Sequence, residues 1–317
     1  MAISNQIKLC VVIPCYNVSK HIEAVIAGLP NHIDFIIAVN DCSADNTLAI
    51  LEAMAINNPK LIVLNHSVNQ GVGGAMISGY KKSLELGADI TIKMDGDGQM
   101  AAANIPRLIQ PILDEKADFA KGNRFRDLKA LRSMPFVRRI GNLGLSFLIK
   151  AASGYWNIFD PTNGYTAVKN EVLAELDFDK LHKRYYFETS MIAELYFSNA
   201  VISDVPMMAI YGDEVSGLSS TKTLFEFPPK LLVTFLRRLV LKYFLFDFNL
   251  GSLYLLTGIP IFLFGLIFGI IKFQHYEKLG VGAPTGTVII PTLFIMLGFQ
   301  LLLAGLAFDV NNYPKKS

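Results

Sequence analysis

The fold of this chain can be predicted from one stretch, Lys93-Met94-Asp95-Gly96-Asp97-Gly98-Gln99. It follows residues 88–92, a short run rich in apolar and β-branched residues that is typical of a buried strand. The carboxylates of Asp95 and Asp97 should therefore emerge where a strand ends, and open α/β sheets bind ligands there. Two carboxylates separated by one glycine can reach a divalent cation and a ribose hydroxyl together, which suits a nucleotide-sugar. The same residues also form ordinary turns, so this stretch needs support from the rest of the chain.

Composition limits the class of protein. The chain has 317 residues, of which 52% are hydrophobic and 18% charged, and its mean hydropathy is +0.38. A chain of this composition is more apolar than an ordinary soluble enzyme and more polar than a bundle made only of membrane spans. We therefore expect one soluble domain plus a membrane part. The formal net charge of +2 gives no argument for a nucleic-acid partner.

Cysteine usage and the N-terminus both favour the cytosol for the soluble part. The three cysteines, Cys10, Cys15 and Cys42, lack metal-ligand spacing, so reduced thiols are expected rather than disulfides. Residues 1–8 lack the charged and apolar regions of a signal peptide.

The first two hundred residues alternate between predicted strands and helices. The predicted strands are 9–13, 35–39, 61–64, 90–94, 118–121 and 201–210. The predicted helices are 19–28, 45–56, 74–86, 104–114 and 138–150. Such a series implies an α/β fold with a mostly parallel sheet covered on both faces. Right-handed crossovers bring the carboxyl ends of the strands to one edge, which Asn17, Asp41 and Asp95 should share.

Two features at this edge have alternative explanations. Asp41 could accept hydrogen bonds from a base or ribose, but a carboxylate near a helix N-terminus is also favoured by the helix dipole. Residues 69–74 open a predicted helix and are rich in glycine. They lack both the Gly-x-Gly-x-x-Gly spacing and the P-loop lysine, so contact with the donor and a simple tight turn both stay open.

Taken together, the stretches 12–17, 40–47, 69–73 and 95–99 resemble the family 2 glycosyltransferases of GT-A fold. Within that family they are most similar to the polyprenyl-phosphate glycosyltransferases, the group of dolichol-phosphate mannose synthase and the bactoprenol glucosyltransferases. The resemblance implies that Asp41 contacts the nucleotide, that Asp95 contacts the ribose or diphosphate, and that Asp97 with Gln99 holds Mg²⁺ or Mn²⁺. Asp95 is a further candidate metal ligand. The candidate nucleotide-sugar-binding residues are Pro14, Tyr16, Asn17, Asp41, Asn69, Gly71, Asp95 and Gly96.

The chain departs from the family pattern at two positions. Asn40 stands where an acidic residue is common, and Val18 stands where a glutamate often follows the asparagine. Both positions belong to the donor side, so the base and the sugar stay open, with a UDP-sugar favoured and GDP-mannose as the alternative.

Arginines in the middle of the chain suit an anionic acceptor. Arg124 follows the predicted strand 118–121 and matches the family position best, and Arg138 and Arg139 begin the helical run. A planar guanidinium can hold a phosphate in a bidentate way that lysine cannot. Attraction of anionic lipid headgroups is the alternative role for Arg132, Arg138 and Arg139.

Glu188 completes the predicted catalytic set with Asp97 and Arg124. Residues 159–166 and 184–190 resemble the family's Asp-x-x-Ser-Gly-Phe and Tyr-x-Phe-Glu stretches, and this makes Glu188 a candidate for positioning or deprotonating the acceptor. A phosphate monoester is largely ionised at neutral pH, so the chemistry does not demand a strong base. A helix N-terminal carboxylate, or a pair with Arg184, is the alternative role for Glu188.

The C-terminal part is predicted to anchor the chain. Residues 225–248 carry cations on one helical stripe, which fits a helix in the membrane interface, although a buried helix between domains is an alternative. Residues 253–273 and 288–308 are long and apolar enough to cross a bilayer. The lysines and arginines flanking these spans put both termini in the cytoplasm. Gly265 and Gly269 suit close helix packing within the pair or between subunits, which leaves a homo-oligomer open.

These signals predict three regions and one activity. The regions are a cytosolic GT-A domain over 1–224, juxtamembrane amphipathic helices over 225–250 and a two-span anchor over 251–317. The predicted activity is metal-dependent, inverting transfer of one sugar from a nucleotide-sugar to a polyprenyl phosphate at the cytosolic membrane face. The alternatives are a polysaccharide synthase and a membrane-tethered nucleotide-sugar-binding module without turnover.

Overall fold

A computed structural model describes residues 7–124, 136–207 and 220–316, with the side chains of 136–140, 142 and 220–225 left out. The chain divides into two compact units, Met1–Phe235 with Pro314–Ser317, and Leu236–Tyr313. Each unit is described by itself.

The first unit is built on a seven-stranded sheet, counted over the described residues. Its strands are β1 (Leu9–Cys15), β2 (Phe35–Asn40), β3 (Leu61–Asn65), β4 (Ile90–Lys93), β5 (Phe119–Asn123), β6 (Thr166–Lys169) and β7 (Ile202–Pro206). The strand order is β3-β2-β1-β4-β6-β5-β7, and all neighbours are parallel except for the two pairs that include β6. The predicted mostly parallel sheet is confirmed. Residues 208–210 of the last predicted strand lie outside the described residues.

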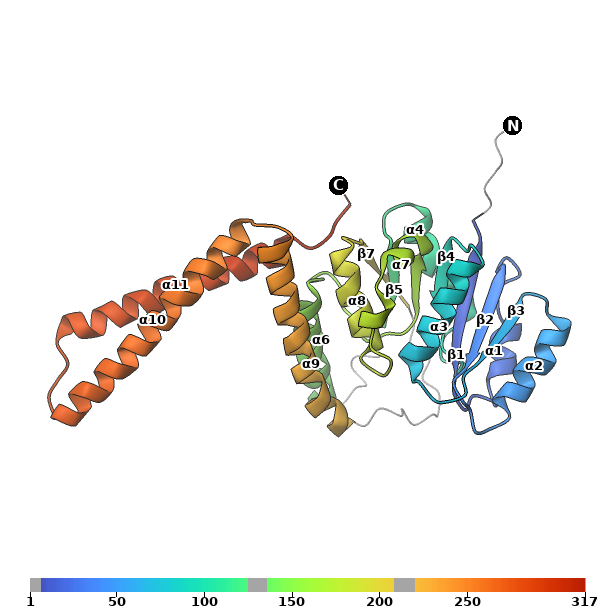
Figure 1. Ribbon diagram of the computed structural model, residues 1–317, viewed down its shortest axis with the longest axis horizontal. Coiled ribbons are helices and arrows are strands. Elements are labelled where there is room, and N and C mark those ends of the chain that lie inside the picture. Colours follow the sequence, from blue (N-terminus) through green and yellow to red (C-terminus); the bar gives the residue numbers. More distant parts are fainter. Residues whose placement is uncertain (1–6, 125–135, 208–219, 317) are drawn as a thin grey trace, which may run out of the picture. The chain divides into compact units, whose positions relative to one another are not determined.

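Helices cover both faces of this sheet because its interior strands, such as β1, are apolar on both sides. The helices are α1 (Ile22–Ala27), α2 (Thr47–Asn57), α3 (Val72–Glu85), α4 (Ile105–Leu113), α6 (Phe136–Ser153), α7 (Asn170–Glu175) and α8 (Phe187–Phe197). Val11 and Ile13 pack with α1, α2 and α4 in one core cluster. Cys10 and Val12 pack with α3 and α8 in the other, and Figure 1 shows these two helices against the same side of the sheet.

Strand β6 was not predicted, and it changes one edge of the sheet. It is antiparallel to β4 and β5, with Thr166 opposite both Lys93 and Lys121. A four-residue strand that is buried almost throughout carries no alternation that periodicity could detect. Because β6 runs in the opposite direction, its first residue lies where β4 and β5 end. Residues 160–165, which precede β6, are thereby brought to the edge that the carboxyl ends share.

Helix α9 (Ser220–Val240) starts in the first unit, and a π-helical turn over Leu241–Leu245 follows it. Its first half packs against α6 and the residue preceding α8: Phe227 and Leu231 join Ile149, Ala152 and Tyr186 in a third core cluster. The predicted helix over 225–248 therefore exists, but it begins earlier, at Ser220, and with the π-helical turn it ends at Leu245.

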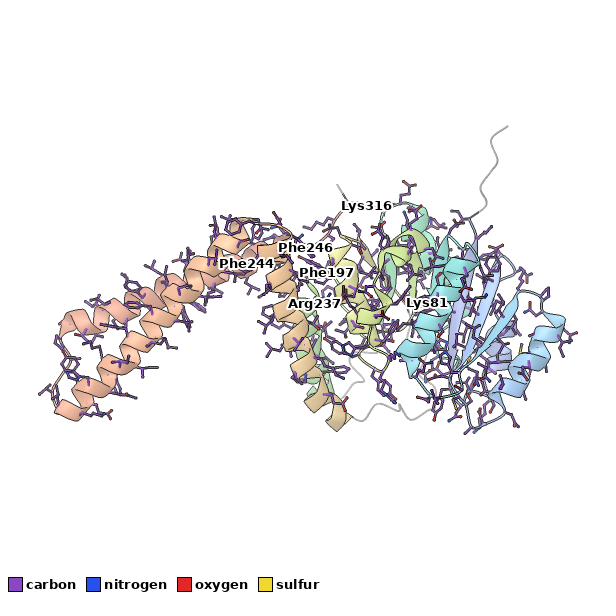
Figure 2. All side chains as sticks on the ribbon, in the orientation of Figure 1. Lys81, Phe197, Arg237, Phe244, Phe246 and Lys316 are labelled. Carbon is purple, nitrogen blue, oxygen red and sulfur yellow. The ribbon has the colours of Figure 1, made fainter. Side chains whose placement is uncertain are left out.

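The second unit is a hairpin of α10 (Leu250–Leu279) and α11 (Thr285–Asn311). By length and composition, both helices are long and apolar enough to cross a membrane. Helix α10 begins at a capping box of Asn249 and Ser252 and ends at Gly280, whose φ is +65°. Figure 2 shows the side chains of Phe244 and Phe246 on the segment that joins α9 to α10, and both are exposed.

Glycines let the two helices of the hairpin approach closely. A Cβ added at Gly265 would lie 2.8 Å from the Ile295 backbone nitrogen, and one at Gly269 would lie 3.2 Å from Pro291. The small-residue spacing predicted to mediate helix packing is therefore used within the pair.

One cation of the predicted interfacial stripe has a different role. Arg238 is 1% exposed, and its guanidinium donates to both carboxylate oxygens of Asp309 at 2.7 and 2.9 Å. The Tyr243 hydroxyl donates to the same carboxylate at 2.5 Å. Arg238 was expected to face lipid headgroups, and this expectation was wrong because a carboxylate 71 residues later in the chain lies beside it.

Candidate active site

The site lies where β1, β2 and β4 end. In the parallel register, Cys15 lies opposite Asn40 and Val12 lies opposite Lys93, so the loops that follow these strands share one edge. The first two loops are joined directly: Asn17, at φ 55°, accepts a hydrogen bond from the Ala44 amide on Oδ1 at 2.8 Å. The residues predicted to bind the donor at the end of β1 are placed here, with Pro14 inside the strand and the Tyr16 side chain exposed after it.

Asp41 organises the loop that follows β3. Its carboxylate accepts hydrogen bonds from the amides of Gln70 at 2.9 Å and Gly71 at 2.7 Å, and it lies 2.8 Å from His66 Nδ1. The Asn69 side chain donates to the Asp41 carbonyl at 3.2 Å. The carboxylate predicted to contact the nucleotide is thus buried and holds the glycine-rich loop, while its nucleotide contact stays a prediction.

The glycine-rich loop needs its glycines for close backbone packing. Gly71 has φ +84°, and a Cβ there would lie 2.6 Å from the Lys183 carbonyl oxygen. A Cβ at Gly73 would overlap the His182 carbonyl oxygen, and the Gly74 amide donates to the Lys183 carbonyl at 3.1 Å. The loop therefore packs against the segment that precedes α8, and Glu188 lies in the first turn of α8. Sequence reasoning left a tight turn and a phosphate loop open, and it did not identify this packing.

Asp95, Asp97 and Gln99 follow β4 as predicted. Asp97 accepts a hydrogen bond from the Gln99 amide at 2.9 Å on Oδ1, which closes the turn. Gly96 packs on the loop after β1, where an added Cβ would lie 3.3 Å from Val18 Cγ2. The oxygens of these side chains are hard donors of the kind that Mg²⁺ and Mn²⁺ take.

The donor set fits a cation that is shared with a substrate. The described residues contain no group of three or more His, Cys, Asp or Glu side chains that could hold a metal ion. Mg²⁺ in nucleotide sites commonly takes only one or two carboxylates and completes its shell with phosphate oxygens and water. Asp95, Asp97 and Gln99 match that pattern better than a closed structural site.

Lys93 joins the two sides of the site. It is 1% exposed, and its ammonium lies 2.6 Å from Asp95 Oδ1 and 3.5 Å from Glu188 Oε1. Burial alone would lower the pKa of Lys93, but the two carboxylates outweigh it and raise that pKa above the ordinary lysine value. Glu188, in the first turn of α8, is therefore brought close to Asp95, and it does not pair with Arg184 within the described contacts.

A second buried lysine lies in the same small cavity and behaves differently. Lys121 is fully buried in the middle of β5 and donates a hydrogen bond to the Asn163 carbonyl. In the described part of the chain it has no ion-pair partner within 4.0 Å. Burial lowers the pKa of Lys121 to about 8, although more distant carboxylates act in the opposite direction.

Arg124 is held by a buried carboxylate. Its Nε donates to Asp160 Oδ2 at 2.8 Å and its Nη2 donates to Asp160 Oδ1 at 3.1 Å. Asp160 is buried, whereas the Arg124 side chain is 41% exposed, so the guanidinium is oriented and still reaches the surface. Arg138 and Arg139 lie in α6 as expected, but their side chains lie outside the described residues.

Several residues of the site carried no signal in the sequence. Lys93 ends β4 as a single cation in an apolar run, and only its partners distinguish it. Gly164 and Asp160 belong to a stretch that was noticed without a role being assigned. The antiparallel β6 brings this stretch to Asp95 and Arg124, and the sequence did not predict that strand.

Comparisons with known proteins agree with this geometry. Residues 10–177 match the model of glycosyl transferase family 2. A UDP-N-acetylglucosamine–dolichyl-phosphate N-acetylglucosaminyltransferase of Methanococcus voltae is 36% identical over 244 residues, which cover 73% of this chain and 94% of that protein. An undecaprenyl-phosphate mannosyltransferase of Micrococcus luteus is 27% identical over 63% of this chain and 82% of its own length.

A solved structure supports the fold. The crystal structure of a mycobacterial protein aligns with a TM-score of 0.55 at 19% identity, and it covers 73% of this chain and 74% of that one. The family match spans the sheet edge that carries Asn17, Asp41, Asp95 and Arg124. The chain therefore belongs to glycosyl transferase family 2, as its motifs predicted.

Proposed function

We propose that this protein transfers one sugar from a nucleotide-sugar to a polyprenyl phosphate, with inversion at the anomeric carbon. The observation that carries the proposal is the pairing of Asp95 and Glu188 with Lys93, and of Arg124 with Asp160, at the edge where β4 and β5 end. The family 2 chain that carries these pairs also has two long apolar helices. The named relatives act on dolichyl and undecaprenyl phosphates, which supports this class of acceptor. A UDP-sugar is the favoured donor because the relative with 36% identity is named for one.

The donor would lie over the loops that follow β1, β2 and β4. Asp95 would accept a hydrogen bond from a ribose hydroxyl with the carboxylate that Lys93 orients. Gly96 and Gly71 would let the backbone approach the diphosphate, as glycines do in other phosphate sites. The loop that Asp41 holds would close the donor side.

The acceptor would approach from the side of Arg124 and Glu188. A phosphate oxygen of the lipid attacks the anomeric carbon, the bond from that carbon to the nucleotide diphosphate breaks, and the diphosphate leaves with the electron pair. A single displacement inverts the configuration. Arg124, oriented by Asp160, would hold the lipid phosphate near reacting distance, and such positioning lowers the barrier without new chemistry.

Glu188 would act mainly by position. The acceptor phosphate is largely ionised at neutral pH and needs little deprotonation. Within the described contacts, the Glu188 carboxylate pairs with the Lys93 ammonium at 3.5 Å, which fixes its orientation. Glu188 would therefore orient the acceptor or a sugar hydroxyl near the reacting carbon.

Asp97 and Gln99, with Asp95, would hold Mg²⁺ or Mn²⁺ together with the diphosphate. When bound, such an ion supplies Lewis-acid stabilisation of the departing diphosphate charge.

Helices α10 and α11 would anchor the enzyme in the cytoplasmic membrane. Exposed aromatic side chains around the π-helical turn, with Arg237 and Lys242 close in sequence, suit the lipid interface. The positive flanks would keep both termini, and with them the catalytic unit, in the cytoplasm where nucleotide-sugars are made.

The test is transfer of labelled sugar into an organic-extractable lipid. Membranes containing the expressed protein are incubated with polyprenyl phosphate and a panel of nucleotide-sugars. Asp97→Asn should reduce transfer about 100-fold or more, the scale of losing one electrostatic stabiliser of the transition state. Asp179→Asn, which makes the same change at an exposed aspartate of the first unit, serves as the control.

Full transfer by Asp97→Asn would refute the metal role of Asp97. Tight binding of a nucleotide-sugar without any lipid product would instead support a binding module without turnover.

A further inference from the structure

Lys93 occupies an unusual position for a lysine. It is the last residue of β4, and its side chain points to the face of the sheet where Tyr80, Phe187 and Met191 pack. An ammonium among such residues costs several kcal/mol unless it is paired. Its partners are Asp95 at 2.6 Å, in the turn after β4, and Glu188 at 3.5 Å, in the first turn of α8.

We propose that Lys93 is a positioning residue that holds the donor-side carboxylate of Asp95 and the acceptor-side carboxylate of Glu188 together through one buried charge. The assignment of Asp95 to the donor side and of Glu188 to the acceptor side rests on the proposed function. The contacts themselves come from β4, from the turn after it and from the first turn of α8. Without the ammonium, two carboxylates that share one cation would repel each other, and neither would keep its orientation.

The backbone of Gly164 lies close against this bridge. A Cβ added at Gly164 would overlap the Lys93 ammonium and would lie 3.0 Å from Asp95 Oδ2. Gly164 belongs to the same stretch as Asp160, the carboxylate that orients Arg124. The bridge is therefore enclosed by the segment that also places the candidate acceptor arginine.

Lys121 offers a matched comparison within the same cavity. It is equally buried and also lies on a strand of the same sheet, but it donates to a backbone carbonyl, and within the described residues it forms no ion pair. Replacing either lysine by methionine makes nearly the same change in volume and charge. Only Lys93→Met removes a link between two carboxylates.

The test measures nucleotide binding without any acceptor lipid. Calorimetry on the full-length protein in detergent would give the affinity for UDP and for GDP, each with Mg²⁺, and the nucleotide that binds the wild type more tightly is then used throughout. Lys93→Met should weaken binding about tenfold, and Lys121→Met should stay within about threefold of the wild type, since residues in one charge network couple by about 1 kcal/mol or more.

The double variant distinguishes a charge bridge from a packing role. In Lys93→Met/Glu188→Gln, the repulsion between positions 95 and 188 is gone. The double variant should therefore bind the nucleotide about threefold or more tightly than Lys93→Met does. A packing defect at residue 93 would not be repaired by neutralising a residue on another helix. Thermal unfolding of each variant checks that all of them are folded.

Three results would overturn the proposal: wild-type affinity in Lys93→Met, no recovery in the double variant, or an equal loss in Lys121→Met. Since this binding assay contains no lipid, its result is independent of whether sugar reaches a polyprenyl phosphate. Absence of lipid product from the wild type would overturn the proposed function and leave the bridge standing.

Discussion

Replacing Lys121 by methionine should stabilise the first unit at neutral pH. Lys121 is fully buried, and burial lowers its pKa from 10.5 to about 8. At about 1.4 kcal/mol per pKa unit, keeping this ammonium charged in the folded protein costs about 3 kcal/mol. Methionine removes that cost and also removes the hydrogen bond to the Asn163 carbonyl, which is worth about 1 to 2 kcal/mol. The expected net gain at pH 7 is about 1 to 2 kcal/mol.

The difference in stability between Lys121→Met and the wild type should depend on pH. Below pH 8, both the folded and the unfolded states carry the proton on Lys121, so the wild type bears the full cost. As the pH rises from about 8 to 10.5, the folded state releases this proton while the unfolded state keeps it, and the wild type gains stability. The advantage of Lys121→Met should therefore shrink above pH 8 and vanish near about pH 9.

Thermal unfolding of the purified full-length protein, followed by the fluorescence of its single tryptophan, measures the effect. At about 2 to 4 °C per kcal/mol, Lys121→Met should raise the Tm at pH 7 by about 4 °C. Lys20→Met, at an exposed lysine, should have nearly the same Tm as the wild type at every pH. A lower Tm for Lys121→Met at pH 7, or a difference that does not change between pH 7 and 10, would refute the reasoning.

Three further substitutions probe other contacts. Asp309→Asn leaves the buried Arg238 guanidinium without its counter-charge and should lower the stability of the helical hairpin by about 3 kcal/mol, measured by thermal unfolding in detergent; unchanged stability would contradict a buried pair. In Gly73→Ala the added methyl group would clash with the His182 carbonyl oxygen, so stability should fall by about 1 to 3 kcal/mol and nucleotide binding should weaken. Unchanged stability and unchanged binding would contradict the packing described for this loop. Arg124→Lys keeps the charge but loses the bidentate pairing with a buried carboxylate, so the KM for polyprenyl phosphate should rise about tenfold while the KM for the donor stays constant; an equal rise in both would place Arg124 outside the acceptor side.

A control for the glycine substitution is available in α6. Gly141→Ala adds the same methyl group where no atom lies within 4 Å, at an exposed helical position. Alanine is the better helix former by about 1 kcal/mol, so this variant should be as stable as the wild type or slightly more stable.

Much of the architecture could be predicted from local patterns. Short apolar runs that alternate with helices dictate a parallel sheet, since each strand must be buried on both faces. Parallel strands end at a common edge, which is why Asn17, Asp41 and Asp95 could be grouped without a structure. The two apolar runs of the anchor are long enough to be recognised by composition alone, and α10 and α11 match them.

The contacts that complete the site could not be predicted from those patterns. Lys93 meets Glu188, and Arg124 meets Asp160, across separations of 95 and 36 residues along the chain, and no periodicity encodes such pairs. The antiparallel β6 is short and buried almost throughout, so it left no alternation to detect.

The fold class, the shared sheet edge and the two long apolar helices follow from the sequence alone, because each depends on the period and length of apolar runs. Which charges lie beside each other follows only from the folded structure. A buried ammonium or guanidinium is stable only beside its partner, and the position of that partner depends on the path of the whole chain.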